Sequence, residues 1–319
     1  MKKLVLLALP IILISSCSTN KNKSNSGSEP VLQELKILCP TGAPAFAFYK
    51  HGNNSNFETN TDPKNIVAMM NKNSEKQMVV IDTVSGVKAI QNGAPYKLAA
   101  TLTFGNFFIA STGKDDNGVM DPGDKIVLFG QGITPDLLFH YLYGDTYDSG
   151  IEYVTNVQDA AKCLIQGKNL VTGNEIKYVF IAQPVLLNAL AKNANATKYV
   201  DVQETYKTKS GGKELIQASV FVKNDTDDYS VNHYLDTLKN DIDAAVNNPE
   251  IISETLSYLS AEEATAKYGV APAMAVNALK DNNGLGLGFK KSLDIKSDID
   301  AFLKDVQNLE ATSEEIYYK

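Results

Sequence analysis

Short apolar runs alternate with amphipathic segments along most of this chain. Mainly apolar runs at residues 35–39, 78–81, 126–129 and 178–181 each lead into a turn containing Gly, Pro, Ser or Thr, and a segment with helical spacing follows each turn. Runs of this length, separated by helices of about ten residues, predict buried parallel strands. The chain is therefore expected to be an α/β protein whose helices cover parallel sheets.

The repeated unit is clearest between residues 125 and 143. An apolar run ends at Gly130, and a helix then restarts with Thr134 at a plausible N-cap and Pro135 at the first helical position. Backbone N–H groups at such a helix start, together with the helix dipole, can hold an anion or a carbonyl group. Ligands of parallel sheets bind outside the carboxyl ends of strands. Four such turns over two halves of the chain predict a cleft between two lobes.

Two further apolar segments are interpreted as crossings between the lobes. One leads from residues 98–102 through Gly105 into residues 107–111, and the other is the run 217–222 after a polar turn. From residue 232 onward the pattern is mostly helical and is expected to pack onto the first lobe. The expected domains are residues 1–16 as a signal peptide, 17–33 as a lipidated Cys and tether, 34–111 with 218–319 as the first lobe, and 112–217 as an inserted second lobe.

The N-terminus has the pattern of a secretory signal. Lys2 and Lys3 precede an apolar run at 4–14, which is too short to span a bilayer, and two serines precede Cys17. This arrangement resembles the bacterial lipobox, in which the Cys is lipidated, for example with palmitate. Residues 18–30 are almost entirely polar and are typical of a flexible tether. An ordinary signal peptide that contains a Cys is the alternative.

Composition narrows the class of ligand and partner. The net charge of −7 argues against nucleic acid, and the hydrophobic (44%) and charged (21%) fractions are those of a globular protein. All 30 basic residues are Lys, so any bound anion must be held by Lys, hydroxyls or backbone N–H groups in place of the bidentate Arg clamp. Cys39 and Cys163 lie in apolar contexts that favour buried thiols, although a disulfide between them stays open.

The order and spacing of several motifs carry a family resemblance. These are Pro40-Thr41-Gly42 after the first strand, the stretch 130–135, Gln183-Pro184, and the aromatic tail at 316–318. With the lipobox, the tether and the two crossings, the chain resembles a substrate-binding lipoprotein of an ABC importer with the type II periplasmic-binding-protein fold. It resembles most the branch that binds nitrate, sulfonate, taurine and thiamine precursors. The resemblance covers residues 35–319.

The resemblance implies capture of a small solute by lobe closure and its delivery to an ABC permease and its ATPase. The protein is then a monomer, held by a lipid on Cys17 to the extracytoplasmic face of the cell membrane, without a cofactor, a bound metal or nucleic acid. Thr134 could cap its own helix or contact the solute. The implied solute-binding residues are Thr41, Gly42, Ala43, Ser85, Gly86, Phe104, Asn106, Gln131, Gly132, Thr134 and Gln183.

Two other functions are weighed: a small-molecule enzyme on the same bilobal fold, and a surface adhesin or sensor lipoprotein with a degenerate cleft. No catalytic triad, paired carboxylates or Cys-His pair stands out, so no enzyme is predicted. The three His residues lack metal-ligand spacing, and the acidic stretch 115–124 lacks the sixth-position Gly of a calcium loop. Without Arg or Trp, a small anion or a flat heteroaromatic is the expected solute.

Overall fold

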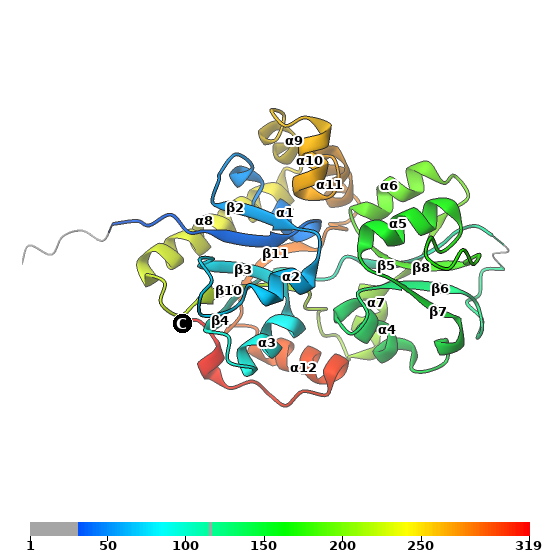
Figure 1. The fold of residues 1–319 in the computed structure, drawn as a ribbon, viewed down its shortest axis with the longest axis horizontal. Coiled ribbons are helices and arrows are strands. Elements are labelled where there is room, and N and C mark those ends of the chain that lie inside the picture. Colours follow the sequence, from blue (N-terminus) through cyan, green and yellow to red (C-terminus); the bar gives the residue numbers. More distant parts are fainter. Residues whose placement is uncertain (1–30, 115–116) are drawn as a thin grey trace, which may run out of the picture. The chain divides into compact units, whose positions relative to one another are not determined.

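The computed structural model describes residues 31–114 and 117–319, and residues 32–319 form one compact unit built on two β-sheets. The first sheet has the strand order β11 (Leu287–Lys291), β4 (Tyr96–Thr103), β10 (Ala218–Lys223), β3 (Met78–Asp82), β1 (Ile37–Pro40) and β2 (Phe57–Asn60). The second has the order β7 (Ile151–Val154), β6 (Ile126–Phe129), β8 (Tyr178–Ala182), β5 (Phe107–Ser111) and β9 (Thr197–Asp201). Figure 1 shows helices around both sheets, which confirms the expected two-lobed α/β fold. The predicted signal peptide, Cys17 and the tether to residue 30 lie outside the described residues.

The structure has the four expected strand-to-helix turns, two in each sheet, and the two turns of one sheet point the same way. β1 leads to α1 (Ala43–Phe46), β3 to α3 (Thr83–Gln91), β6 to α4 (Thr134–Tyr143), and β8 to α6 (Val185–Lys192). β1 pairs in parallel with β3, and β6 pairs in parallel with β8, as the apolar runs predict. The carboxyl ends of these strands therefore share one edge in each sheet.

The sheets are nevertheless mixed, because the crossing strands run in reverse. In β5, Phe107 lies opposite Ala182, the last residue of β8, and in β10, Ala218 lies opposite Asp82, the last residue of β3. Each crossing strand thus enters its new sheet at the edge where the parallel strands end. A strand that starts at that edge must run antiparallel to its neighbours.

The first crossing lies earlier than the sequence indicated. Residues 107–111 were expected in the first lobe, but they form β5 of the second sheet, so the chain crosses at residues 104–106. The second crossing follows α7 (Val202–Lys209) and ends at β10. An apolar run shows that a strand exists but does not show which sheet the strand joins.

The remaining helices cover the sheets. Asn156 caps α5 by accepting from the backbone of Asp159, and Ser260 and Glu263 form a capping box at the start of α10. The other elements are α2 (Pro63–Ala68), α5 (Val157–Gln166), α8 (Asp228–Asn247), α9 (Glu250–Thr255), α10 (Ala261–Tyr268), α11 (Pro272–Lys280), α12 (Lys296–Gln307), and the 3₁₀ turns η1 (Tyr49–His51), η2 (Asp148–Gly150) and η3 (Glu314–Ile316). Within the two described stretches, no helix has the length and apolar character needed to cross a bilayer.

The last long helix, α12, packs against both lobes, which the sequence pattern did not reveal. In Figure 1, α12 runs beneath α3 toward α4 of the second lobe, and it contacts α4. The Phe302 ring meets the Tyr206 ring of α7 edge-on at 5.7 Å between centroids, and the Tyr206 hydroxyl donates to Asp305 at 3.1 Å. At its other end, the Lys296 ammonium lies over the Tyr317 ring, and Tyr317 pairs with Leu98 of β4.

Both cysteines of the folded unit are free and buried, so the disulfide alternative does not hold. Cys39 lies in β1 of the first sheet, and Cys163 lies in α5 of the second lobe. Burial raises the pKa of both thiols, because the thiolate is poorly solvated there. The two side chains therefore behave as small apolar core residues.

Gly86 allows α3 to lie close to β10. A Cβ placed at Gly86 would collide with the ring of Phe221, which is completely buried in β10. The contact explains a glycine in the middle of a helix, where glycine costs about 1 kcal/mol relative to alanine.

We expect Gly86→Ala to lower the free energy of unfolding by about 1–3 kcal/mol, because the Phe221 ring has no room to move aside. In a Phe221→Leu background the same change is expected to cost less, since the smaller side chain removes the collision. Urea unfolding of the four chains in this double-mutant cycle measures the difference. An equal cost in both backgrounds would show that Gly86 is not needed for this contact.

Candidate functional site

A cavity of about 120 Å³ lies where the carboxyl ends of the strands in the two sheets meet. The end of β3 and the turns after β1, β2, β6, β7 and β8 contribute to its wall, as do both crossings. Each of these turns faces the other sheet because the parallel strands end at the shared edge. The site is therefore a direct consequence of the topology.

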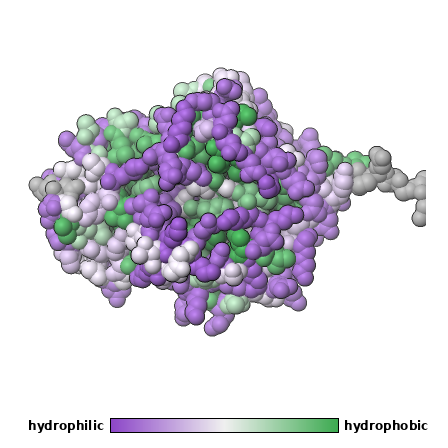
Figure 2. All heavy atoms as spheres, turned by 180° about the vertical axis from the view of Figure 1, so that it is seen from behind, coloured by the Kyte–Doolittle hydropathy of each residue, from purple (hydrophilic) through white to green (hydrophobic). Residues whose placement is uncertain are grey.

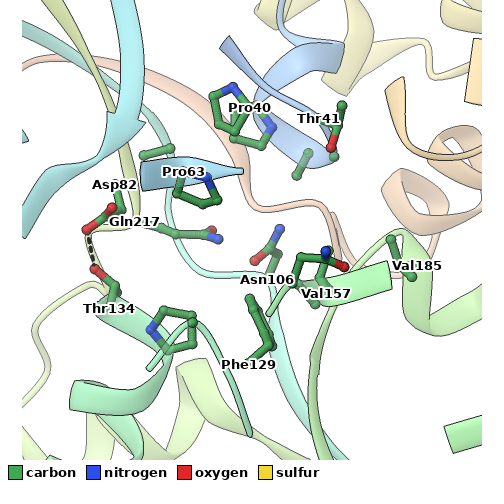
Figure 3. Close-up of a pocket in the computed structure, with 18 of the residues that line it drawn as sticks. Pro40, Thr41, Pro63, Asp82, Asn106, Phe129, Thr134, Val157, Val185 and Gln217 are labelled. Atoms are coloured by element: carbon green, nitrogen blue, oxygen red, sulfur yellow. Dashed lines mark hydrogen bonds between the residues drawn. The ribbon is translucent and has the colours of Figure 1, made fainter. Parts of the chain in front are cut away.

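Most of the wall is apolar. The first lobe contributes Pro40, Ala43 and Ile81, and the second contributes Phe129 and Val185. Figure 3 shows the Phe129 ring and the Val157 and Val185 side chains on one side of this space, with Pro40 and Pro63 on the other. An apolar enclosure with a few polar groups is the usual composition of a small-molecule site.

The two crossings place amide side chains in this apolar wall. Asn106 and Gln183 are 2% and 1% exposed, and the Asn106 Nδ2 group donates to the Gln183 carbonyl at 3.0 Å. The Gln183 Oε1 atom accepts from the Leu187 N–H at 3.3 Å. Gln217 occupies the equivalent position at the second crossing, one residue before β10. Figure 3 shows the Gln217 and Asn106 side chains directed into the same space.

Four polar atoms of this wall are buried without a hydrogen-bond partner: Asp82 Oδ2, Asn106 Oδ1, Gln183 Nε2 and Gln217 Oε1. A buried unpaired polar group costs roughly 1–3 kcal/mol, so folded proteins leave few of them. Here four of them belong to residues that line one cavity. A ligand that pairs with them would recover that cost.

Two hydrogen bonds join the lobes across the cavity. The Thr134 hydroxyl at the start of α4 donates to Asp82 Oδ1 at 2.7 Å, as Figure 3 shows, and Gln158 Nε2 donates to Thr41 Oγ1 at 3.4 Å. Thr134 caps no helix: the N-cap of α4 is Ile133, and Thr134 is completely buried. The cap alternative for Thr134 is therefore wrong, and in this structure its hydroxyl ties the two lobes together.

Burial raises the pKa of Asp82, because its carboxylate is removed from water. Hydrogen bonds from Ser85 and from the Thr134 hydroxyl oppose this effect, as does the charge of Lys88. Since folding raises this pKa above its ordinary value of 3.8, ionisation of Asp82 favours the unfolded chain. Its contribution to stability therefore declines as the pH rises from 3.8 through the folded-state pKa.

Six of the residues implied by the sequence lie in the cavity wall: Thr41, Gly42, Ala43, Asn106, Thr134 and Gln183. At Gly42, φ is +103°, a conformation that favours glycine, and its N–H donates to the Tyr268 carbonyl at 3.0 Å. The Thr41 N–H donates to the Asn60 carbonyl at 3.1 Å. The turn after β1 is thus held by backbone bonds, and it presents Thr41 to the cavity by its side chain.

The other five implied residues lie outside the wall. Ser85 turns its N–H to Asp82, and Gly86 packs on Phe221. Phe104 lies at the opposite side of the crossing, where the Lys290 ammonium sits 5.0 Å from its ring centroid.

The expected anion cradle after β6 is already occupied. Gln131 and Gly132 are exposed, and the Gly132 N–H donates to the Asp136 carboxylate at 2.8 Å. Asp136 also accepts from the Tyr153 hydroxyl at 2.8 Å. A carboxylate of the chain itself therefore takes the place at the start of α4 that an anionic ligand would fill.

Sequence reasoning missed Asp82, Gln217 and the start of α5. Asp82 directly follows a predicted strand and Gln217 directly precedes one, so both lay at the expected cleft edge. Their residue types alone gave no signal, since polar residues end most strands. Across residues 31–114 and 117–319, no three His, Cys, Asp or Glu side chains are placed to hold a metal ion.

Several solved structures that share this fold are named as parts of ABC transport systems. An ABC transporter protein from Parabacteroides distasonis is 18% identical, with a TM-score of 0.67 over 88% of this chain and 94% of its own. The ligand-binding component of an ABC-type import system from Staphylococcus aureus, with zinc bound, is 9% identical, with a TM-score of 0.64 over 89% and 96%. The periplasmic aliphatic sulphonate binding protein SsuA from Escherichia coli is 10% identical, with a TM-score of 0.60 over 89% and 92%.

These likenesses confirm, at the level of the fold, the resemblance to periplasmic binding proteins. No protein-family model and no curated protein matches the chain. Function therefore has to be argued from the site itself.

We expect Thr134→Val to lower the free energy of unfolding by about 1–3 kcal/mol, because a buried carboxylate oxygen loses a donor. The loss is expected to be larger at about pH 7 than at about pH 4, since more Asp82 is ionised at the higher pH and the hydroxyl favours the ionised form. Urea unfolding at both pH values measures it. Thr134→Ser keeps the hydroxyl and serves as the control. Equal losses at both pH values would contradict the bond to a carboxylate.

Proposed function

We propose that this chain is the extracytoplasmic solute-binding component of an ABC import system. The observation that carries the proposal is the cavity between the lobes, with four buried polar atoms that have no partner within the chain. Such atoms lower the stability of the empty protein and stabilise a complex, which is the signature of a site that selection keeps for binding. The shared fold with components of ABC transporters supports this reading.

The chemistry of the wall favours binding over catalysis. Of the described residues that line the cavity, Asp82 alone has an ionisable side chain. General acid–base chemistry and covalent catalysis need a nucleophile or a second titratable group within hydrogen-bond reach of the reacting atoms. The apolar and amide groups of this wall can orient a solute but supply no such pair.

The surface supports a solute-binding protein better than it supports an adhesin or sensor with a degenerate cleft. On the face shown in Figure 2, hydrophilic residues predominate and hydrophobic residues form separate groups among them. Large partner-binding patches are usually broad and continuous. The cavity is also open to a small solute, since its own side chains leave about 120 Å³ unfilled.

Of the two solute classes expected from the sequence, the heteroaromatic class fits this wall better than the anionic class. Phe129 offers an aromatic face, and no Lys or His is among the described residues of the wall. The lobes would close over the solute, and the Thr134–Asp82 and Gln158–Thr41 bonds would hold the closed arrangement. The protein would then deliver the solute, as a monomer, to a permease driven by an ATPase.

We expect Gln217→Leu to raise the free energy of unfolding of the empty protein by about 1 kcal/mol and to weaken solute binding. The change removes a buried acceptor that has no partner, so the empty chain gains while the complex loses a contact. Thermal unfolding with and without a solute screen measures both effects; a true ligand at about a hundredfold excess over Kd stabilises by about 2.7 kcal/mol. Loss of stability in the empty variant, or solute shifts that match the wild type, would contradict the proposal.

The lipid anchor on Cys17 is part of the same proposal. We expect the full chain to incorporate a palmitate analogue and to sediment with membranes in its bacterial host, and Cys17→Ala to do neither. Hydrophobic burial of acyl chains accounts for the membrane attachment. Cys39→Ala, which leaves the lipobox intact, is the matched control and should label normally. Absence of label on the wild type would favour an ordinary signal peptide.

A further inference from the structure

The unpartnered atoms of the cavity differ in number by type. Three are oxygens: the amide acceptors of Asn106 and Gln217, and Oδ2 of the Asp82 carboxyl group, which accepts when Asp82 is ionised; one is a donor, the Gln183 Nε2 group. With Asp82 ionised, a state that a nearby cation favours, a ligand that satisfies them must present more donors than acceptors. This asymmetry bears on the solute class and rests on the function proposed above.

The amide orientations of Asn106 and Gln183 follow from their other bonds. Asn106 must turn its Nδ2 group to the Gln183 carbonyl, which can only accept, so Oδ1 is the free atom. Gln183 must turn Oε1 to the Leu187 N–H, which can only donate, so Nε2 is the free atom. The free acceptor on Asn106 and the free donor on Gln183 are thus fixed by the surrounding backbone.

The charges around the cavity also favour a hydrogen-bond donor or a cation over an anion. The wall contains the Asp82 carboxyl group and, among its described residues, no basic side chain. The start of α4, which could attract an anion, is neutralised by Asp136. An oxyanion placed here would face acceptor oxygens and would find no cation, whereas an amine or an amino-substituted ring would meet groups of opposite polarity.

We infer that the cavity binds a small amine or amino-substituted solute, neutral or cationic, that donates hydrogen bonds to Asp82, Asn106 and Gln217 and accepts one from Gln183. The cavity of about 120 Å³ sets its size, well below the roughly 300 Å³ of the smallest drug-sized pockets. The inference separates this chain from binding sites that capture sulfonates or phosphates.

The test uses probe pairs of similar size that differ in their head group: ethanolamine against ethanesulfonate, and benzamidine against benzenesulfonate. Thermal unfolding of the full chain is measured with each probe, and the solute released on denaturing the purified protein is identified by mass spectrometry. Stabilisation by the amine or amidine member, or release of an amine-bearing solute, supports the inference.

Failure of this inference can be distinguished from failure of the proposed function. Stabilisation by a sulfonate, or release of an oxyanion, overturns the inference and leaves the proposed function standing. No stabilisation by any probe together with no released solute overturns both. A rise in unfolding temperature caused by an amine therefore supports the inference only when variants show that the amine binds in the cavity.

Variants show whether the probe that stabilises the protein binds in the cavity. Asp82→Asn is expected to weaken binding of the amine probe about tenfold or more, which is the usual effect of losing a charged hydrogen-bond partner. Asp225→Asn changes the net charge equally at an exposed position and is expected to leave affinity unchanged. If Asp82→Asn fails to fold, Gln217→Leu supplies the second measurement. Unchanged affinity in the Asp82 and Gln217 variants would place the probe elsewhere and overturn the inference.

Discussion

The structure depends on the direction in which two strands enter their sheets. β5 and β10 each begin at the edge where the parallel strands of the new sheet end, and they run antiparallel to those strands. This arrangement brings both crossings and the starts of α1, α4, α5 and α6 to one place. It also puts Asn106 and Gln217, the residues just before these strands, at the meeting point of the two sheets. A single topological constraint therefore builds the cavity and supplies part of its polar lining.

The fold was predictable because its signal is repeated. Four apolar runs, each followed by a turn and a helix, were sufficient to identify two lobes. The first boundary was displaced because residues 107–111 are as apolar as the strands of either sheet. The contact of α12 with the second lobe was missed for a related reason, since an amphipathic helix shows that one face is buried but not against which partner.

Prediction of the site was limited by hydrogen bonds that only the folded chain reveals. The turn after β6 has the composition of an anion cradle, yet Asp136 of the same helix takes the Gly132 N–H. Gly86 follows a strand, where a glycine can let a ligand approach the backbone, yet in the structure it leaves room for the Phe221 ring. Asn106 and Gln183 were found because they lie at a crossing and at a helix start, where geometry and residue type agree. Asp82 lies at a comparable position, the end of β3, where its residue type alone gave no signal; in the structure it also caps α3.

Under the proposed function, the contacts of α12 would connect solute exchange to a distant part of the chain. Separating the lobes would require this helix to leave either Tyr206 or the Tyr317 region. That cost adds to the preference for the closed arrangement, and the apparent affinity of any solute that binds only the closed state scales with the fraction of molecules already closed. Sequence changes along α12 would thus alter retention and release of the proposed solute while every contact inside the cavity stays the same.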